Sequence, residues 1–158
     1  MTRRLVVTCL SALLASAATD ARAAETSTCT GTITGAVKAT FSCTVIAEAK
    51  GKGTQFTITA NGPVAGLKSI LVADYQVPGA LTVGRFDDET RPTGSSQLTT
   101  AAGAKYVSGT ATDTVILYID TAERMRGPTA RYLTSGRLEV VLVPVGGKGP
   151  EAKLKVLF

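Results

Sequence analysis

The residues of this chain that could do chemistry are few, and the most concentrated of them are acidic. Asp87, Asp88 and Glu89 stand together at the head of a long polar stretch. Hard cations such as Ca²⁺ bind several carboxylate and carbonyl oxygens at once, so the cluster is a candidate cation site. A glycosidase needs two carboxyl groups held at a fixed separation across a cleft, and Asp74 or Asp120 could complete such a pair. The plainest interpretation is a solvated polar loop.

A second candidate group is basic. Arginine is well suited to planar anions such as phosphate and carboxylate, and the C-terminal third of the chain is locally rich in it. The pattern indicates either a solvated face or an anion-binding patch for lipopolysaccharide phosphates or acidic polysaccharide. The arginines show no aromatic interleaving of the kind that single-stranded nucleic acid binding uses. Nucleic acid is not an expected partner, because the N-terminal segment discussed below predicts a compartment outside the cytoplasm. The four residues are Arg124, Arg126, Arg131 and Arg137.

Two residue types are missing, and their absence excludes several chemistries. The sequence contains no histidine and no tryptophan. Without histidine there can be no Ser-His-Asp or Cys-His nucleophile and none of the His-rich sites usual for zinc, copper and iron. We therefore assign no catalytic residue and expect no cofactor beyond the Ca²⁺ that the acidic cluster could bind.

The N-terminal segment is typical of a cleaved signal peptide. Arg3 and Arg4 precede an uncharged, mostly apolar run over residues 5–18, and Ala21-Arg22-Ala23 places small residues at the −3 and −1 positions. The run is too short to span a bilayer, which needs about 20 residues. We expect residues 1–23 to be removed and residues 24–158 to form one domain, secreted or periplasmic, without a transmembrane helix.

Removal of the signal changes both the charge and the cysteine count. Residues 1–23 hold three of the 17 basic and one of the 12 acidic residues, so the net charge falls from +5 to about +3, which is ordinary for a soluble domain. Cys9 leaves with the signal, and Cys29 and Cys43 remain. A pair of cysteines in an oxidising compartment predicts a disulfide, because a metal site would need further Cys or His ligands.

Alternating apolar and polar residues predict strands along most of the mature chain. From Cys29 to Ala47 the apolar residues recur at every second position, the period of a half-buried sheet. A hairpin that turns near Gly35 would bring Cys29 opposite Cys43. Further strands are expected over residues 55–60, 68–75, 80–86, 105–108, 114–121, 138–143 and 152–158. Residues 87–103 are expected to form an exposed loop with one short strand at 97–99, and residues 122–125 one helical turn.

These elements amount to eight or nine strands and no convincing amphipathic helix in the mature part. Short strands at this spacing are typical of an antiparallel sandwich or barrel. We expect an all-β, antiparallel β-sandwich of jelly-roll or immunoglobulin-like size, with one disulfide.

Three stretches together resemble a known group of proteins. The first is residues 29–43, which contain the two cysteines. The second is residues 132–144, which begin Tyr-Leu-Thr-Ser-Gly and so include Gly136. The third is the last strand, which ends in Phe158. They resemble uncharacterised secreted bacterial β-sandwich proteins that share an early Cys pair, a Gly-led penultimate strand and a terminal aromatic strand. The resemblance implies the fold and carries no activity.

The function expected from these observations is a non-enzymatic binding or envelope-associated structural module. Its partner could be an envelope polysaccharide or another protein. The first alternative is a carboxylate-dependent hydrolase or lyase that acts on extracellular polysaccharide through the acidic cluster. The second is a small outer-membrane β-barrel, because Leu154, Val156 and Phe158 alternate to an aromatic C-terminus. The small number of aromatic residues speaks against the barrel, since such barrels carry aromatic girdles.

Overall fold

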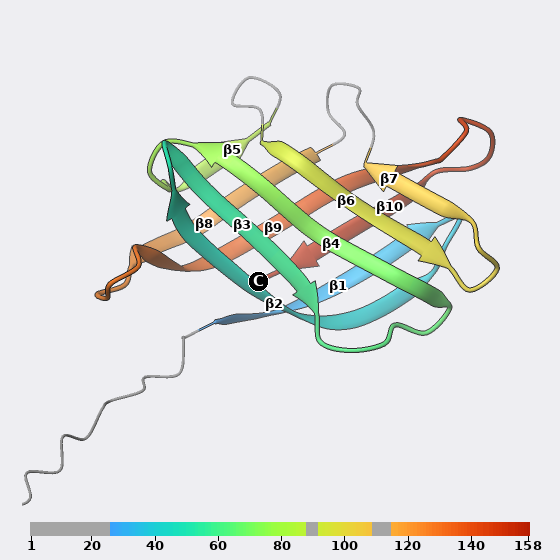
Figure 1. The fold of residues 1–158 in the computed structure, drawn as a ribbon, viewed down its shortest axis with the longest axis horizontal. Coiled ribbons are helices and arrows are strands. Elements are labelled where there is room, and N and C mark those ends of the chain that lie inside the picture. The colour runs from blue at the N-terminus through green and yellow to red at the C-terminus, as the bar shows by residue number, and fades with distance from the viewer. Residues whose placement is uncertain (1–25, 88–91, 109–114) are drawn as a thin grey trace, which may run out of the picture.

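The described part of the chain folds into a single antiparallel sheet of ten strands. A computed structural model describes residues 26–87, 92–108 and 115–158, and these contain strands and turns but no helix. The predicted signal peptide, residues 1–23, lies outside the described residues. The strands are β1 (Ser27–Gly35), β2 (Ala39–Lys50), β3 (Gly53–Ala60), β4 (Leu67–Pro78), β5 (Gly84–Phe86), β6 (Thr93–Thr100), β7 (Lys105–Ser108), β8 (Val115–Arg124), β9 (Arg131–Pro144) and β10 (Ala152–Leu157) (Figure 1).

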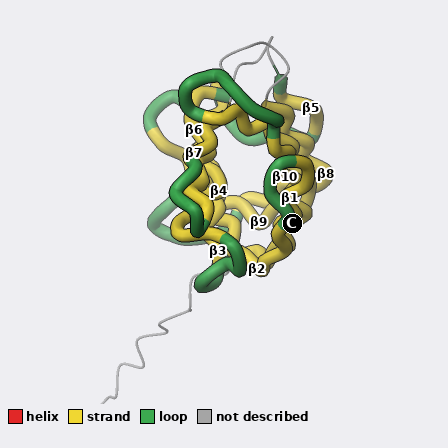
Figure 2. Tube along the Cα trace, turned by 90° about the vertical axis from the view of Figure 1, so that its right-hand side faces the viewer, coloured by secondary structure: helices red, strands yellow, loops and turns green. Residues whose placement is uncertain are grey.

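The sheet closes on itself because β9 has partners along both of its edges. The ring runs from β9 through β10, β1, β2, β3, β4, β6 and β7, and back to β9. β7 and β8 follow one another along the same edge of β9, where Ser108 pairs with Leu142 and Val115 pairs with Val140. β5 pairs with β8. The result is a barrel with eight strand positions around its wall, and Figure 2 shows the strands surrounding a common axis.

The predicted sandwich is therefore wrong, although the all-β antiparallel class is confirmed. Alternation along a strand shows which side chains face inward. These side chains can pack equally well against a second sheet or against the far wall of a barrel. Curvature comes from irregularities that alternation does not reveal. The register of β4 against β6 shifts between Leu71 and Asp74, and that of β8 against β9 shifts between Ile119 and Thr121. Such bulges bend and twist a strand, which helps a sheet to close.

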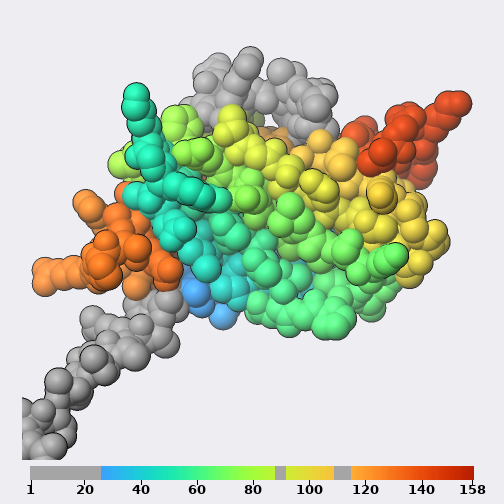
Figure 3. Space-filling model, in the orientation of Figure 1, coloured from blue at the N-terminus to red at the C-terminus, as the bar shows by residue number. Residues whose placement is uncertain are grey.

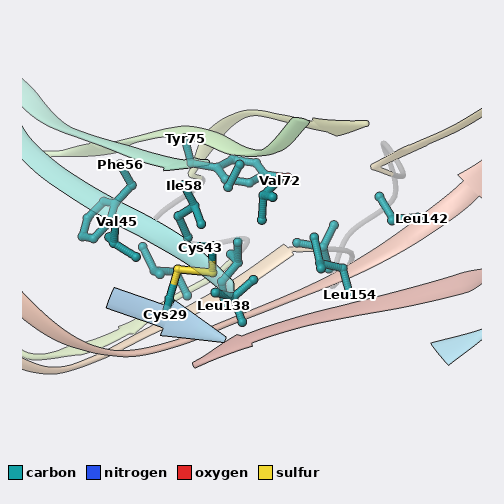
Figure 4. Close-up of a cluster of buried hydrophobic side chains, with 14 of the residues drawn as sticks. Cys29, Cys43, Val45, Phe56, Ile58, Val72, Tyr75, Leu138, Leu142 and Leu154 are labelled. Atoms are coloured by element: carbon teal, nitrogen blue, oxygen red, sulfur yellow. A yellow bond between two sulfur atoms is a disulfide. The ribbon is translucent and has the colours of Figure 1, made fainter. Parts of the chain in front are cut away.

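The interior of the barrel is filled by apolar side chains. Each strand sends alternate residues inward, where they meet those of the opposite wall (Figure 4). β10 shows the pattern clearly, since Leu154 and Val156 are buried whereas Lys153 and Lys155 are exposed. The largest fully buried side chains are Tyr75, Phe56, Ile33, Ile58, Leu117, Ile119, Leu138, Leu142, Leu154, Val72, Val77 and Val156.

The predicted hairpin and disulfide are confirmed. β1 and β2 pair in the expected register, with Cys29 directly opposite Cys43, and a disulfide joins the two. Both cysteines are buried on the inner face. The turn begins at Gly35, whose φ of 90° lies in the region that favours glycine.

Two local predictions are corrected. Much of the segment 87–103 that was expected to be a loop is β6, whose short polar side chains gave little strand signal. Ser96 and Leu98 face the interior, and the other residues face outward or lie near the strand ends. Residues 122–124 continue β8 instead of forming a helical turn, because they pair with β9. No helix in the described part of the chain is long and apolar enough to cross a membrane.

A buried hydroxyl cluster joins β4, β6 and β7 inside the barrel. The Ser96 hydroxyl donates to the carbonyl oxygen of Val72, and the Tyr75 hydroxyl lies 3.1 Å from Ser96 Oγ. Because the single Ser96 proton is directed at Val72, Tyr75 acts as the donor to Ser96. Burial raises the pKa of Tyr75, because the charged phenolate is disfavoured inside the barrel.

We expect Tyr75 to add to the alkaline sensitivity of the fold. A raised pKa in the folded state means that its contribution is complete below about pH 10, the unfolded value, and is lost as the pH rises through the folded pKa. Tyr75→Phe should therefore lose less stability than the wild type between about pH 9 and pH 11. Urea unfolding at both pH values measures the difference. The other tyrosines and the lysines are common to both proteins, so equal losses would contradict the prediction.

Candidate functional site

The acidic cluster is only partly within the described residues. Asp87 follows β5 and its Oδ2 lies 3.1 Å from Nε of Arg85, while Asp88 and Glu89 lie outside the described residues. Asp74, on the outer wall, accepts a hydrogen bond from the Gln55 amide at 2.6 Å. Asp120 is exposed on β8, which does not pair with β4. No group of three or more His, Cys, Asp or Glu residues that could hold a metal occurs within the described ranges, and the cation site stays a prediction.

The four arginines divide into a group of three and one separate residue. Arg124, Arg126 and Arg131 lie at or within the turn between β8 and β9, and Arg131 Nε is 3.7 Å from a carboxylate oxygen of Glu48 on β2. Arg137 is six residues further along β9, about 20 Å away at the rise of an extended strand. Its guanidinium carbon lies 3.6 Å from the ring centroid of Tyr118 on β8.

A groove that sequence reasoning did not identify crosses the outer wall of β8, β9, β10 and β1. It has a volume of about 450 Å³. Strand register builds it, because residues that pair across the strands project outward in rows. One row pairs Thr32 with Lys155, Lys155 with Glu139 and Glu139 with Ile116, and the next pairs Thr34 with Lys153 and Lys153 with Val141. We call these seven residues the wall groove: Thr32, Thr34, Ile116, Glu139, Val141, Lys153 and Lys155.

The wall groove is positively charged and has both polar and apolar contacts to offer. Glu139 is shared between two cations, since one of its oxygens lies 3.4 Å from Arg137 Nε and 3.6 Å from Lys155 Nζ. No ion pair joins Lys153 to another residue within the described ranges, so its ammonium group is available to an anion. Threonine hydroxyls can donate and accept hydrogen bonds, and Val141 supplies an apolar surface.

Sequence reasoning missed the wall groove because its residues come from four separate parts of the chain. Only the pairing of β10 with both β1 and β9 brings Thr32, Lys153 and Glu139 together. The one local signal is the alternation of lysine with apolar residues in the last strand, which marks Lys153 and Lys155 as outward. No protein-family model, curated protein or solved structure was found to match this chain.

Proposed function

We propose that this chain is a non-enzymatic binding module, secreted or periplasmic, that takes its ligand on the outer wall of the barrel. The supporting observation is the distribution of side chains. Barrels of eight strands that carry a small ligand hold it inside, but here Phe56, Tyr75 and Leu138 are among the buried side chains that fill the interior. Most polar side chains face outward, and the wall groove collects several of them over an apolar floor.

The chemistry of the wall groove favours a segment of acidic envelope polysaccharide. Thr32 and Thr34 present hydroxyls to sugar hydroxyls, and Ile116 and Val141 present apolar surface to a sugar ring. Lys153 provides a cation for a carboxylate on the sugar. The volume of about 450 Å³ lies within the range of roughly 300–1,000 Å³ typical of ligand sites.

The same distribution of side chains argues against the two alternatives. Transmembrane barrels face an apolar band outward and a polar surface inward, whereas β10 buries Leu154 and Val156 and exposes Lys153 and Lys155. For a hydrolase or lyase, two carboxylates would have to face one another across a cleft. Among the carboxylates considered for this role, Asp74 lies on β4, which pairs with neither β5 nor β8. Asp87 follows β5 and Asp120 lies on β8, and the register of Phe86 with Leu117 and Gly84 with Ile119 sets the two about four positions apart along this strand pair.

We expect the double variant Thr32→Val and Thr34→Val to bind oligogalacturonate about tenfold more weakly than the wild type. Each hydroxyl lost removes a hydrogen bond worth about 0.5–1.5 kcal/mol, and two such losses correspond to roughly a tenfold change. Valine keeps the β-branched shape and so preserves the strand. Isothermal titration calorimetry measures the affinity.

A matched control makes the same change elsewhere on the wall. Thr57 and Thr59 also face outward, but on β3, so Thr57→Val with Thr59→Val should leave the affinity unchanged. A neutral glucan oligomer of equal length tests the role of charge and should bind more weakly than oligogalacturonate. The proposal fails if the wild type does not distinguish the two sugars, or if both threonine pairs lower the affinity equally.

A further inference from the structure

Five lysines that are scattered along the sequence lie at one end of the barrel. β1, β3, β6 and β9 run towards this end, and β2, β4, β7 and β10 run away from it, so four turns gather there, towards the right of Figure 1. Each turn, or the strand that begins directly after it, carries at least one lysine. We call this the lysine end, formed by Lys38, Lys68, Lys105, Lys148 and Lys153.

The positive charge of the lysine end is not neutralised. All five lysines are exposed, and none forms an ion pair with another residue in the part of the chain that the structure describes. Glu151 is the only carboxylate in these four turns, so five lysines and one glutamate give a net charge of about +4. The other end carries basic residues as well, but its three carboxylates, one of which pairs with Arg131, lower its net charge to about +2. The basic residues are Lys50, Lys52, Arg124, Arg126 and Arg131, and the acidic ones are Glu48, Asp120 and Glu123.

The tips of the same turns are small and apolar. Val145, at the start of the β9–β10 turn, is 60% exposed, and this turn projects from the barrel at the upper right of Figure 3. Tight backbone bends at Gly146 and Gly147, with φ of 99° and 71°, leave little side-chain bulk beyond it. Exposed apolar residues occur in all four turns: Ala36, Pro63, Ala65, Ala101, Ala102, Val145 and Pro150.

We infer that the lysine end docks on a bilayer surface that contains anionic lipid headgroups. Lysine ammonium groups on flexible stems suit the diffuse field of such a surface, and each one near it contributes to binding. Four turns spread across the end of a barrel form a broad contact surface, not a groove for a single chain. Their apolar tips can enter the interfacial layer while the lysines remain at headgroup level. This inference goes beyond the proposed function, because it rests on the end of the barrel, which shares only Lys153 with the wall groove.

Sedimentation with lipid vesicles tests the inference. The protein is the chain from residue 24, which includes every described strand. It is mixed with vesicles of phosphatidylcholine alone, or of phosphatidylcholine and phosphatidylglycerol at about seven to three. We expect binding to the anionic vesicles only, and a strong reduction at about 0.5 M NaCl, where the Debye length is only a few ångströms.

Charge removal at each end of the barrel then locates the contact. The triple variant Lys38→Gln, Lys105→Gln and Lys148→Gln avoids the wall groove and should bind anionic vesicles about a hundredfold more weakly. The control Lys50→Gln, Lys52→Gln and Arg126→Gln removes the same charge from the opposite end and should bind nearly as the wild type does. Equal losses in both variants, or equal binding to neutral vesicles, would overturn the inference.

Two further results separate this inference from the proposed function. Thr32→Val with Thr34→Val should leave vesicle binding unchanged, because the change is confined to the wall groove. If the lysine triple variant loses oligogalacturonate binding while the wild type ignores anionic vesicles, the lysine end binds acidic polysaccharide, and membrane docking is wrong.

Discussion

Replacing Leu154 with alanine is expected to lower the free energy of unfolding by about 2–5 kcal/mol, the usual range for removing a buried leucine side chain. Leu157 lies three positions further along β10 and provides the matched control. Leu154 is 1% exposed and points into the barrel, whereas Leu157 is 52% exposed and points out. Leu157→Ala should therefore change the stability by no more than about 0.5 kcal/mol.

Urea unfolding of the two variants measures both free energies under the same conditions. The difference between them reports mainly which face of β10 is inside the barrel. In a sandwich, Leu154 would also be buried and Leu154→Ala would also lower the free energy of unfolding. This pair of variants therefore tests which face of β10 points inward and does not test whether the sheet closes into a barrel. Equal losses for the two leucines would contradict the inward packing of Leu154 described above.

The part of the fold that could be predicted from sequence is the part built by local contacts. The β1–β2 hairpin is set by alternation on either side of a short turn at Gly35, which also fixes Cys29 opposite Cys43. Closure of the barrel depends instead on β9, which pairs with β10 and β2 on one edge and with β8 and β7 on the other. Alternation carries no information about which distant strand fills an edge.

The candidate sites also fall into those that could be identified from the sequence and those that could not. Asp87 and the arginines of the β8–β9 turn could be identified because residues of one type stand close together in the sequence. The lysine end could not, because its five lysines are single residues in different turns and only the up-and-down direction of the strands collects them. Charge counted along the chain therefore gave an ordinary total, whereas charge counted by position in the barrel is higher at the lysine end than at the other end.

Removal of the disulfide is expected to have an effect of similar size to that of Leu154→Ala. Fourteen positions separate Cys29 from Cys43, and closing a loop of this length stabilises a fold by about 3 kcal/mol in the chain-entropy model. Replacing both cysteines by alanine should lower the melting temperature by roughly 10 °C, given a few degrees per kcal/mol for a domain of this size.

The reduced wild-type protein separates the covalent link from side-chain packing. It keeps both sulfur atoms in the core, so its melting temperature reports the link alone, and the further decrease in the alanine variant reports the lost packing of two buried side chains. Calorimetry of the oxidised, reduced and alanine forms measures both steps. An unchanged melting temperature on reduction would show that the link adds nothing to stability.

The loss of stability on reduction of the disulfide should affect the whole barrel and not the β1–β2 hairpin alone. β1 pairs with β2 on one edge and with β10 on the other, so β10 would lose one of its two partners if β1 came loose. β10 also contributes Leu154 and Val156 to the core, and its release would open the wall between β9 and β1. We therefore expect reduction to shift a single cooperative transition, with the same denaturant dependence, and not to produce a separate early transition of the N-terminal strands.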